Sequence, residues 1–360
     1  KGKFIKMKKK ILISTGGSGG HVIPAIILYE HLSKKFDVII STDIRGLKFL
    51  DKNNHQIEIV NTPKLNNFLF LPFNLLLIIS MTMKSFFLLR RKKIEKIFSI
   101  GGYMSIPLIL AAKLLKLNIF LVEPNQVLGR ANKFFLNSCK KIFCYSEKIK
   151  NFPKLYRDKM IIINPLVREK IYTSNISKQT NEKFTLLIVG GSQGANIFDK
   201  NLKNTIVNIS KRKSIKIIHQ TSEKNIVNLS KFYNDNNIEN KIFSFDKNFL
   251  NTIQQADLCI TRAGASTLAE LSVLNIPFIA VPLPTSKDNH QLENALFYKN
   301  KDCCWLIEQN HFEIDIEHFL DEIFELKMSL LKKKENLKKL NYQNSWINVN
   351  QKIIKTINEN

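Results

Sequence analysis

The chain has 360 residues, of which 55 are Lys or Arg and 30 are Asp or Glu, so its net charge is 55 − 30 = +25 with histidine neutral. Its 44% apolar and 24% charged residues are typical of folded proteins, and its length suits two domains of ~100–200 residues, which excludes a disordered chain or one small domain. The charge suits nucleic acid, an anionic membrane surface or phosphorylated substrates, but lysines spread along the whole chain without a nucleic-acid-binding motif argue against nucleic acid.

The chain begins with a basic stretch and a short apolar one. Met7 resembles an initiator methionine, so we expect Lys1–Lys6 to be an extension without function. Only Ile11 to Ile13 are apolar before polar and glycine residues follow, which is too short for a signal peptide and predicts a first β-strand. The five cysteines are odd in number and lack paired short spacings, which favours a reducing, cytosolic compartment over a disulfide framework.

Short apolar runs rich in β-branched residues alternate with helical patterns along the chain, which is typical of parallel α/β units. The polar segment 173–183, after Asn164-Pro165, predicts a linker between two halves. Each half contains an apolar strand, a Gly-Gly-Ser turn and a helix start, in ILISTGGSGG and LLIVGGSQGA, so we predict two similar Rossmann-like domains. The predicted strands are 11–14, 38–41, 97–100, 119–122 and 142–145 in the first half, and 184–189, 215–219, 258–261 and 278–281 in the second.

The segment 65–83 carries no charged residue and is followed by Lys84 and by the basic cluster 90–93. A membrane-spanning helix needs about 20 predominantly apolar residues, but Pro72 and three asparagines interrupt this segment, and a crossing here would separate two parts of one α/β half. A buried helix and an interfacial apolar patch with a basic rim are the other interpretations. The last one predicts a protein of the membrane surface.

Glycine-rich junctions between strands and helices are the strongest local features. In STGGSGGH (14–21), glycines would let the backbone approach an anion at a helix N-terminus. The third glycine of a dinucleotide fingerprint is replaced by Val22 and no Walker lysine follows, so NAD and ATP are poorly supported. His21 stands where it could serve as a base.

Three further junctions, at 101–105, 190–196 and 261–270, repeat this arrangement. One such loop alone is more often a tight turn, but four of them favour a ligand that carries phosphate and hydroxyls. Glu270 is either a solvated helix residue or a carboxylate that holds a ribose diol. Arg168 is either a linker charge or a phosphate clamp.

Six motifs together resemble the MurG family of N-acetylglucosaminyltransferases, in order and spacing, from Met7 to the end of the chain. They are GGSGGHVIPA, GGYMSIP, EPNQVLGRANK, NPLVR, LIVGGSQGAN, and ADLCITRAGASTLAEL followed by DNHQLENA. The resemblance implies a GT-B fold, with two Rossmann-like domains that carry parallel sheets and face each other across a cleft. The N-terminal acceptor- and membrane-binding domain would span 7–164, with a C-terminal helix at about 341–360 packing back on it, and the donor-binding domain 165–340.

The activity that the resemblance implies is transfer of N-acetylglucosamine from UDP-GlcNAc to the 4-hydroxyl of MurNAc in undecaprenyl-pyrophosphoryl-MurNAc-pentapeptide (lipid I), giving lipid II. Its implied place is the cytoplasmic face of the bacterial inner membrane, as a peripheral protein of peptidoglycan synthesis. No Asp-x-Asp triplet is present and we expect no metal or other cofactor. The alternatives are a related glycolipid synthase with a diacylglycerol acceptor, a UDP-sugar epimerase, and a basic protein that is not an enzyme.

The resemblance also implies a set of donor-binding positions. The family's HEQN segment is Val122-Glu123-Pro124-Asn125 here, which loses a histidine and gains a proline, and a pair that is usually Gln-Gln is His290-Gln291. The lost histidine leaves His21 as the predicted general base, with Glu123 second. The predicted UDP-GlcNAc-binding residues are Ser18, Gly19, Gly20, Asn125, Arg168, Ser192, Asp246 (through its main chain), Ala265, Ser266, Thr267, Leu268, Ala269, Glu270 and Gln291.

Overall fold

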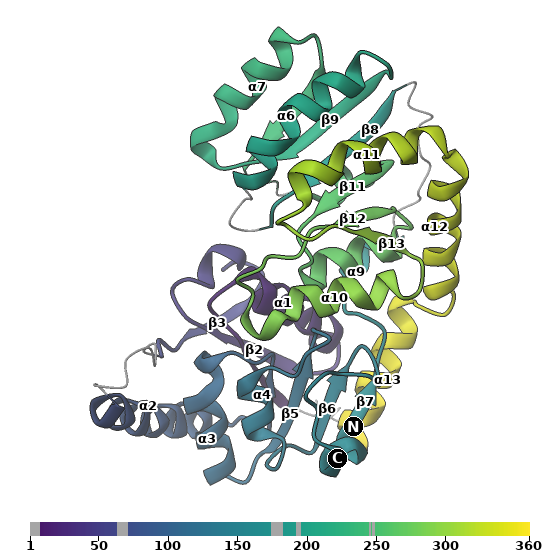
Figure 1. Cartoon of the computed structure of the whole chain (residues 1–360). Helices are drawn as coiled ribbons and strands as arrows, with labels where there is room; N and C mark the ends of the chain where they lie inside the picture. The colour runs from purple at the N-terminus through teal and green to yellow at the C-terminus, as the bar shows by residue number, and fades with distance from the viewer. Residues whose placement is uncertain (1–7, 63–70, 174–182, 192–195, 245, 247–248) are drawn as a thin grey trace, which may run out of the picture. The chain divides into compact units, whose positions relative to one another are not determined.

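A computed structural model describes residues 8–62, 71–173, 183–191, 196–244, 246 and 249–360 (Figure 1). The chain divides into two compact units: unit 1 runs up to Glu169 and takes in Ser345–Asn360, and unit 2 is Lys170–Asn344. The expected N-terminal extension, and 174–182 of the expected linker, lie outside the described residues.

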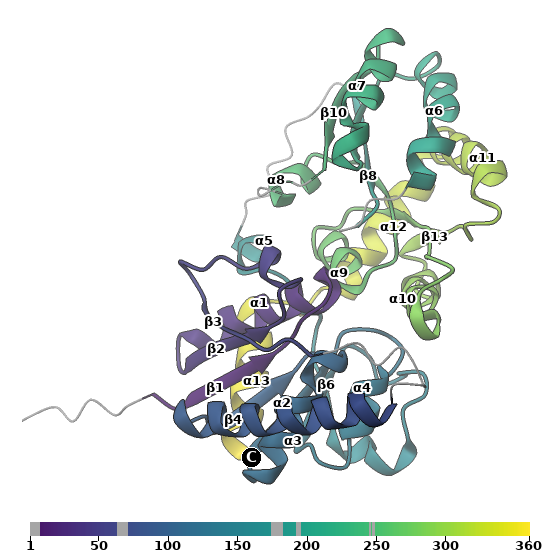
Figure 2. The same cartoon turned by 90° about the vertical axis from the view of Figure 1, so that its left-hand side faces the viewer.

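Unit 1 is built on a seven-stranded sheet in the order β3-β2-β1-β4-β5-β6-β7, in which every neighbouring pair is parallel. Its central strands are buried along almost their whole length, with apolar residues in the middle of each, because helices cover both faces. Figure 2 shows α2 and α3 side by side on the sheet. The elements are β1 (Lys10–Ser14), α1 (Gly19–Ser33), β2 (Asp37–Thr42), β3 (Gln56–Ile59), α2 (Leu71–Arg91), β4 (Lys96–Ser99), α3 (Ile106–Leu114), β5 (Asn118–Glu123), α4 (Arg130–Phe135), β6 (Lys141–Cys144) and β7 (Met160–Ile162).

Unit 2 repeats this topology with a six-stranded parallel sheet in the order β10-β9-β8-β11-β12-β13. Both sheets therefore follow the doubly wound order 3-2-1-4-5-6, and the prediction of two Rossmann-like domains is confirmed. The short helix α5 (Glu169–Thr173) lies at the boundary between the units. The other elements are β8 (Phe184–Val189), α6 (Asn196–Ser210), β9 (Ile215–Gln220), α7 (Ile226–Asp235), β10 (Glu239–Phe243), α8 (Phe249–Ile253), β11 (Leu258–Thr261), α9 (Ala265–Val273), β12 (Phe278–Ala280), α10 (His290–Lys299), β13 (Cys304–Leu306), α11 (Phe312–Glu325) and α12 (Lys327–Leu340).

The C-terminal helix α13 (Trp346–Glu359) belongs to unit 1, where it packs against α1. The Trp346 ring stacks on His31 of α1, with 3.5 Å between the ring centroids, and Asn350 donates to the His31 carbonyl at 2.8 Å. Burial, with Lys34 nearby, lowers the pKa of His31 to about 3, so the ring is neutral at pH 7. At the other end of α13, the Lys96 ammonium donates to the Ile357 carbonyl at 2.6 Å, which matches a cation to the helix C-terminus.

The nine strands predicted from the sequence are confirmed to within one residue at each end. Four strands were not predicted, and each one is an edge strand of its sheet: β3, β7, β10 and β13. All five cysteines are buried free thiols.

Helix α2 carries most of the uncharged segment 65–83, of which 65–70 lies outside the described residues. Pro72 is its second residue, where a missing N–H costs no helical hydrogen bond. No helix among the described residues is long and apolar enough to span a membrane.

Candidate active site

In unit 1, a glycine junction lies at the point where the strand order reverses. The chain leaves β1 through Gly16 to Ser18 and enters α1, while the loop 100–105 leaves the neighbouring strand β4. Ligands of doubly wound sheets bind at such carboxyl ends, beside the switch point. Ser18 and Gly20 are exposed at the helix start, and Gly19 is buried. Because Pro24 has no N–H, the Gly20 carbonyl lacks its usual helical donor.

The buried carboxylate of Asp43 is hydrogen-bonded to the backbone of this junction. It accepts hydrogen bonds from the backbone N–H groups of Gly17 and Gly46, each at 2.9 Å, and from Arg45 Nε at 2.7 Å. Gly17 has φ +83°, which favours glycine. One loop amide is thus already bonded to a negative charge, so this junction is a poorer phosphate cradle than its glycines predict. Asp43 and Arg45 were not among the predicted site residues.

His21 lies on the first turn of α1, against the loop that follows β4. Its Nδ1 is 3.2 Å from the Ile100 carbonyl oxygen. A carbonyl only accepts hydrogen bonds, so this geometry favours the tautomer with the proton on Nδ1 and leaves Nε2 as the basic nitrogen. A Cβ atom at Gly102 would lie 3.6 Å from Cδ2 and Nε2 of the ring, and Gly102 has φ +79°. The loop and the carbonyl therefore orient the ring.

Glu123, the second predicted base, lies at the end of β5 and is only 2% exposed. Its two carboxylate oxygens accept hydrogen bonds from the Gly129 N–H at 2.8 Å, from Asn132 Nδ2 at 2.9 Å, and from the backbone and side chain of Asn125 at 3.2 Å each. Burial raises the pKa of this carboxyl, and these hydrogen bonds oppose the rise. The geometry gives Glu123 the part of an anchor for the loop 124–129, rather than that of a base.

Asn125, a predicted donor-binding residue, is half-buried and oriented by Glu123. Asn132 donates to the Val122 carbonyl at 3.0 Å as well as to Glu123. Asn132 was not among the predicted site residues, and only its place in the EPNQVLGRANK motif could have indicated it.

In unit 2, the start of α9 lies at the carboxyl end of β11, beside the switch point with β8. The N-cap Gly264 is extended, with φ −71° and ψ 133°, and Ala265 is the first helical residue. The N–H of Leu268 already donates to the Gly264 carbonyl at 3.0 Å. The amides of Ala265, Ser266 and Thr267 are those that the helix itself leaves to an outside acceptor, with the positive end of its dipole behind them.

The deeper residues of this stretch are packed inside unit 2. The side chains of Leu268 and Ala269 are 0% and 1% exposed. These two side chains therefore pack the helix onto the sheet, and contact of these two residues with the donor stays a prediction. Glu270 is 4% exposed, so a ligand could reach only an edge of its carboxylate.

Three polar side chains brace the loops around the start of α9. Arg262 donates to the carbonyl groups of Val281 and Pro282, at 3.1 and 3.3 Å, and to Gln309 at 2.6 Å. Asn294 donates to the Ala263 carbonyl at 3.1 Å. The carboxamide oxygen of Gln291, a predicted contact, accepts from the Leu283 N–H at 3.0 Å, which leaves its NH₂ group for other acceptors.

Of three further predicted donor-binding residues, two contact other side chains and one lies outside the described residues. Ser192 lies outside the described residues. Arg168 belongs to unit 1 and interacts electrostatically with Glu30, which is eleven residues beyond the start of α1 and so about 16 Å along that helix. Asp246 Oδ2 accepts from Thr252 and Lys241, and the uracil contact through the Asp246 main chain stays a prediction.

The exposed side of α2 is apolar at helical spacing, with Leu75, Leu76, Ile79, Met83 and Phe87 each 47–66% exposed. Lys84, Arg90 and Arg91 accompany them. No group of three or more His, Cys, Asp or Glu residues in the described parts of the chain could hold a metal ion.

The chain matches two family models: the glycosyltransferase family 28 N-terminal domain over residues 11–144, and the glycosyltransferase family 28 C-terminal domain over residues 185–347. It is 48% identical over 358 residues to the UDP-N-acetylglucosamine--N-acetylmuramyl-(pentapeptide) pyrophosphoryl-undecaprenol N-acetylglucosamine transferase of Pelagibacter ubique, which covers 98% of this chain and 100% of that protein. A protein of the same name from Rickettsia felis is 36% identical over 88% of this chain and 91% of its own length.

Solved structures share the fold. The crystal structure of Acinetobacter baumannii MurG superposes with a TM-score of 0.76 at 21% identity, covering 98% of this chain and 100% of that one. UDP-GlcNAc 2-epimerase from Neisseria meningitidis, bound to UDP-GlcNAc, superposes with a TM-score of 0.68 at 15% identity, covering 98% of this chain and 100% of that one. At these identities the likeness shows the fold alone, since this fold serves both transferases and epimerases.

Proposed function

The chain belongs to glycosyltransferase family 28, and on that premise we infer that it transfers N-acetylglucosamine from UDP-GlcNAc to undecaprenyl-pyrophosphoryl-MurNAc-pentapeptide, giving lipid II for peptidoglycan synthesis. The observation that carries this conclusion is the 48% identity to a transferase of that name, over 98% of this chain and 100% of the relative. Both units take part in the match, because the N-terminal model falls in unit 1 and the C-terminal model covers most of unit 2. A diacylglycerol acceptor is not favoured.

We propose that unit 1 supplies the base and that His21 is that base. As the MurNAc 4-hydroxyl oxygen attacks the anomeric carbon of GlcNAc, Nε2 accepts the hydroxyl proton, the new β-1,4 bond forms, and the bond to the UDP oxygen breaks. This single in-line displacement needs no covalent intermediate. The hydrogen bond from Nδ1 to the Ile100 carbonyl, at 3.2 Å, would stabilise the resulting imidazolium.

We propose that the start of α9 in unit 2 binds the donor diphosphate through the amides of Ala265, Ser266 and Thr267. The helix dipole there would stabilise the negative charge that grows on UDP as it leaves. An edge of Glu270 would accept the ribose hydroxyls, and the Gln291 NH₂ group would donate to the sugar. Contacts from Ser18, Gly19, Gly20, Asn125, Arg168, Ser192 and the Asp246 main chain remain predictions.

The function is tested by incubating the purified chain with UDP-GlcNAc and either the MurNAc-pentapeptide lipid or diacylglycerol. We expect a disaccharide-lipid and free UDP with the first acceptor only. A glycosylated diacylglycerol, or an isomerised nucleotide sugar without transfer, would instead support the synthase or the epimerase alternative.

We also propose that the enzyme lies on the cytoplasmic face of the inner membrane as a peripheral protein, with the exposed side of α2 against an anionic leaflet. The support is the row of exposed apolar residues with basic neighbours, which is typical of interfacial helices. Flotation with anionic liposomes tests this. Equal binding by a variant with Leu76 and Ile79 replaced by serine would remove α2 from the proposal.

A further inference from the structure

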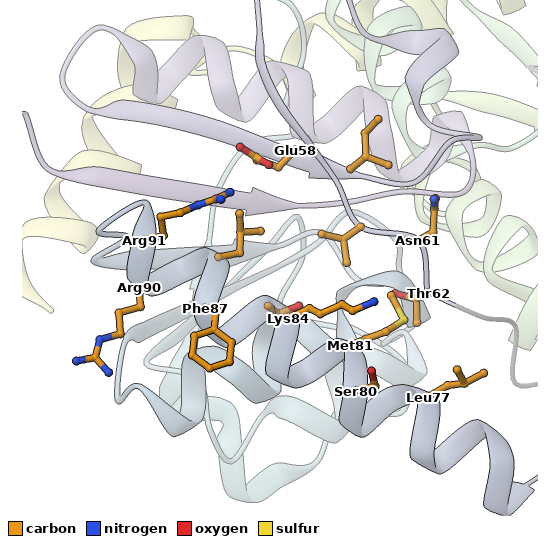
Figure 3. A pocket seen from close by; sticks show the side chains of 14 residues that line it. Glu58, Asn61, Thr62, Leu77, Ser80, Met81, Lys84, Phe87, Arg90 and Arg91 are labelled. Atoms are coloured by element: carbon orange, nitrogen blue, oxygen red, sulfur yellow. The ribbon is translucent and has the colours of Figure 1, made fainter.

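A groove of about 1150 Å³ runs between α2 and the chain that leaves β3, within unit 1 (Figure 3). Ligand pockets commonly measure ~300–1,000 Å³, so this groove is large enough for a sizeable part of a ligand. Its apolar lining comes from both sides: Ile59, Val60, Leu77, Met81, Phe87 and Leu88.

The groove is also positively charged. Lys84, Arg90 and Arg91 line it, and none of them has an ion-pair partner within the part of the chain that the structure describes. Glu58, an acidic lining residue, is paired with Lys92. In Figure 3 the Lys84 side chain reaches along the groove toward the side of Asn61 and Thr62. An apolar trough with unpaired cations fits a hydrocarbon chain that ends in an anion.

One end of the groove adjoins the loops of the candidate active site. The Thr62 hydroxyl donates to the Met104 carbonyl at 3.2 Å, and Met104 lies two residues after Gly102, where a Cβ atom would lie 3.6 Å from the His21 ring. The Ile44 N–H donates to the Asn61 side-chain oxygen at 3.0 Å, beside Arg45. Arg45 in turn donates to the Tyr103 hydroxyl. A chain lying in the groove would therefore have its end beside the loops that hold the predicted base.

We propose that this groove binds the polyprenyl diphosphate part of the acceptor: the isoprene units nearest the diphosphate lie between α2 and β3, and Lys84 binds the diphosphate. This inference rests on the proposed function, because it takes the acceptor from there. In the acceptor the diphosphate links the polyprenyl chain to MurNAc, so a chain held in the groove would present MurNAc toward the His21 loop.

The location of the groove favours the acceptor over a phospholipid of the bilayer. A phospholipid would need only the exposed side of α2, whereas the groove continues inward to residues bonded to the active-site loops. The neighbouring glycine junction is a weak alternative for the diphosphate because Asp43 already occupies the Gly17 amide.

The test compares two acceptors in detergent micelles, so that membrane binding plays no part. One carries the natural polyprenyl chain, and the other carries a methyl group in its place on the same MurNAc-pentapeptide diphosphate. Ser80→Trp adds bulk to the groove lining, and Lys84→Gln removes its cation. Leu155→Trp and Lys35→Gln are matched controls on exposed positions of unit 1 outside the groove.

We expect Ser80→Trp to lower kcat/KM about tenfold for the polyprenyl acceptor and not for the methyl acceptor. Lys84→Gln should lower it several-fold for both, because both carry the diphosphate, and the controls should match the wild type. The proposal would be overturned if Ser80→Trp and the wild type had equal kcat/KM on the polyprenyl acceptor. If Ser80→Trp also bound liposomes more weakly while its kinetics in micelles stayed unchanged, the groove would be assigned to a phospholipid instead. No product from the wild type with either acceptor would refute the proposed function instead.

Discussion

The two units share one topology but treat their helix starts differently. At the start of α1, a protein carboxylate takes the Gly17 amide and the helix carries a histidine oriented by the Ile100 carbonyl. At the start of α9, three amides are left to an outside acceptor, and neutral braces such as Asn294 support the loop. The same strand-turn-helix geometry thus suits proton transfer in unit 1 and anion binding in unit 2.

This difference shows that the groups packed around a glycine junction decide its chemistry, more than the glycines do. A carboxylate oxygen 2.9 Å from a loop amide satisfies that donor, and the ion pair with Arg45 balances the charge of this carboxylate.

Removing the imidazole of unit 1 should have the largest effect. We expect His21→Ala to lower turnover by ~10²–10⁴-fold, the usual contribution of a general base. UDP-GlcNAc binding should be retained, because the donor is assigned to unit 2. Steady-state kinetics with the MurNAc-pentapeptide lipid, alongside calorimetric titration of the donor, measures both. Turnover near that of the wild type would remove His21 from the mechanism.

Removing the carboxylate charge under the unit 1 junction comes next. Burial raises the pKa of Asp43, but hydrogen bonds from Gly17, Arg45 and Gly46 outweigh it, so the pKa lies below its ordinary value. A lowered native pKa stabilises the fold at pH values above the unfolded pKa of ~3.9, and this stabilisation disappears as the pH falls through the native pKa. We expect Asp43→Asn to lower the free energy of unfolding at pH 7 by about 2 kcal/mol.

The measurement can be restricted to unit 1, because Trp346 belongs to unit 1 and Trp305 to unit 2. In a Trp305→Phe background, Trp346 fluorescence would follow denaturation of unit 1. The difference in the free energy of unfolding between Asp43→Asn and its parent should narrow as the pH falls below ~3.9, because the parent then also loses the charge. Exposed Asp158→Asn is the control. If this difference in the free energy of unfolding stayed constant below pH ~3.9, the carboxylate charge would not be what stabilises the junction.

Strands at the centre of each sheet could be predicted from the local sequence, whereas strands at the sheet edges could not. Central strands such as β1 and β8 are buried on both faces, so they are continuously apolar and easily recognised. The missed strands lie at sheet edges: β3 reads QIEI with no buried residue, and β10 reads ENKIF, in which only Phe243 is buried. An edge strand forms because the adjacent strand of the sheet provides hydrogen-bond partners for its backbone. The local sequence pattern does not show that adjacent strand.

The candidate site divides in the same way. The glycine junctions and His21 were visible in the sequence because they are local motifs. Asp43 was not, because its role depends on β2 lying beside β1. Glu123 belonged to a recognised motif, but the hydrogen bonds that occupy it come from the folded loop around it.

Removing one amide from unit 2 tests its assignment as the anion site. Ala265→Pro deletes an N–H at the first helical position, where proline is well tolerated, and the extended Gly264 before it is compatible with proline. We expect UDP-GlcNAc to bind about tenfold more weakly, since a hydrogen bond to a charged group contributes about 1.5 kcal/mol or more. Calorimetric titration measures this. Ala265→Ser keeps the N–H and should bind as the wild type does, whereas wild-type affinity in the proline variant would place the diphosphate elsewhere.

The smallest effect should distinguish the surfaces of the two units. A Lys or Arg close to an anionic leaflet contributes about 1 kcal/mol, so Arg90→Gln on α2 should weaken binding to anionic liposomes about fivefold. Lys224→Gln removes an equal charge from an exposed position of unit 2 and should change nothing, since only unit 1 is assigned to the membrane. The Debye length falls from about 8 Å at physiological salt to about 3 Å at 1 M. The difference in liposome affinity between the two variants should therefore disappear at high salt. Equal weakening by both would mean that the net charge of +25 acts as a whole and that α2 has no special part in binding.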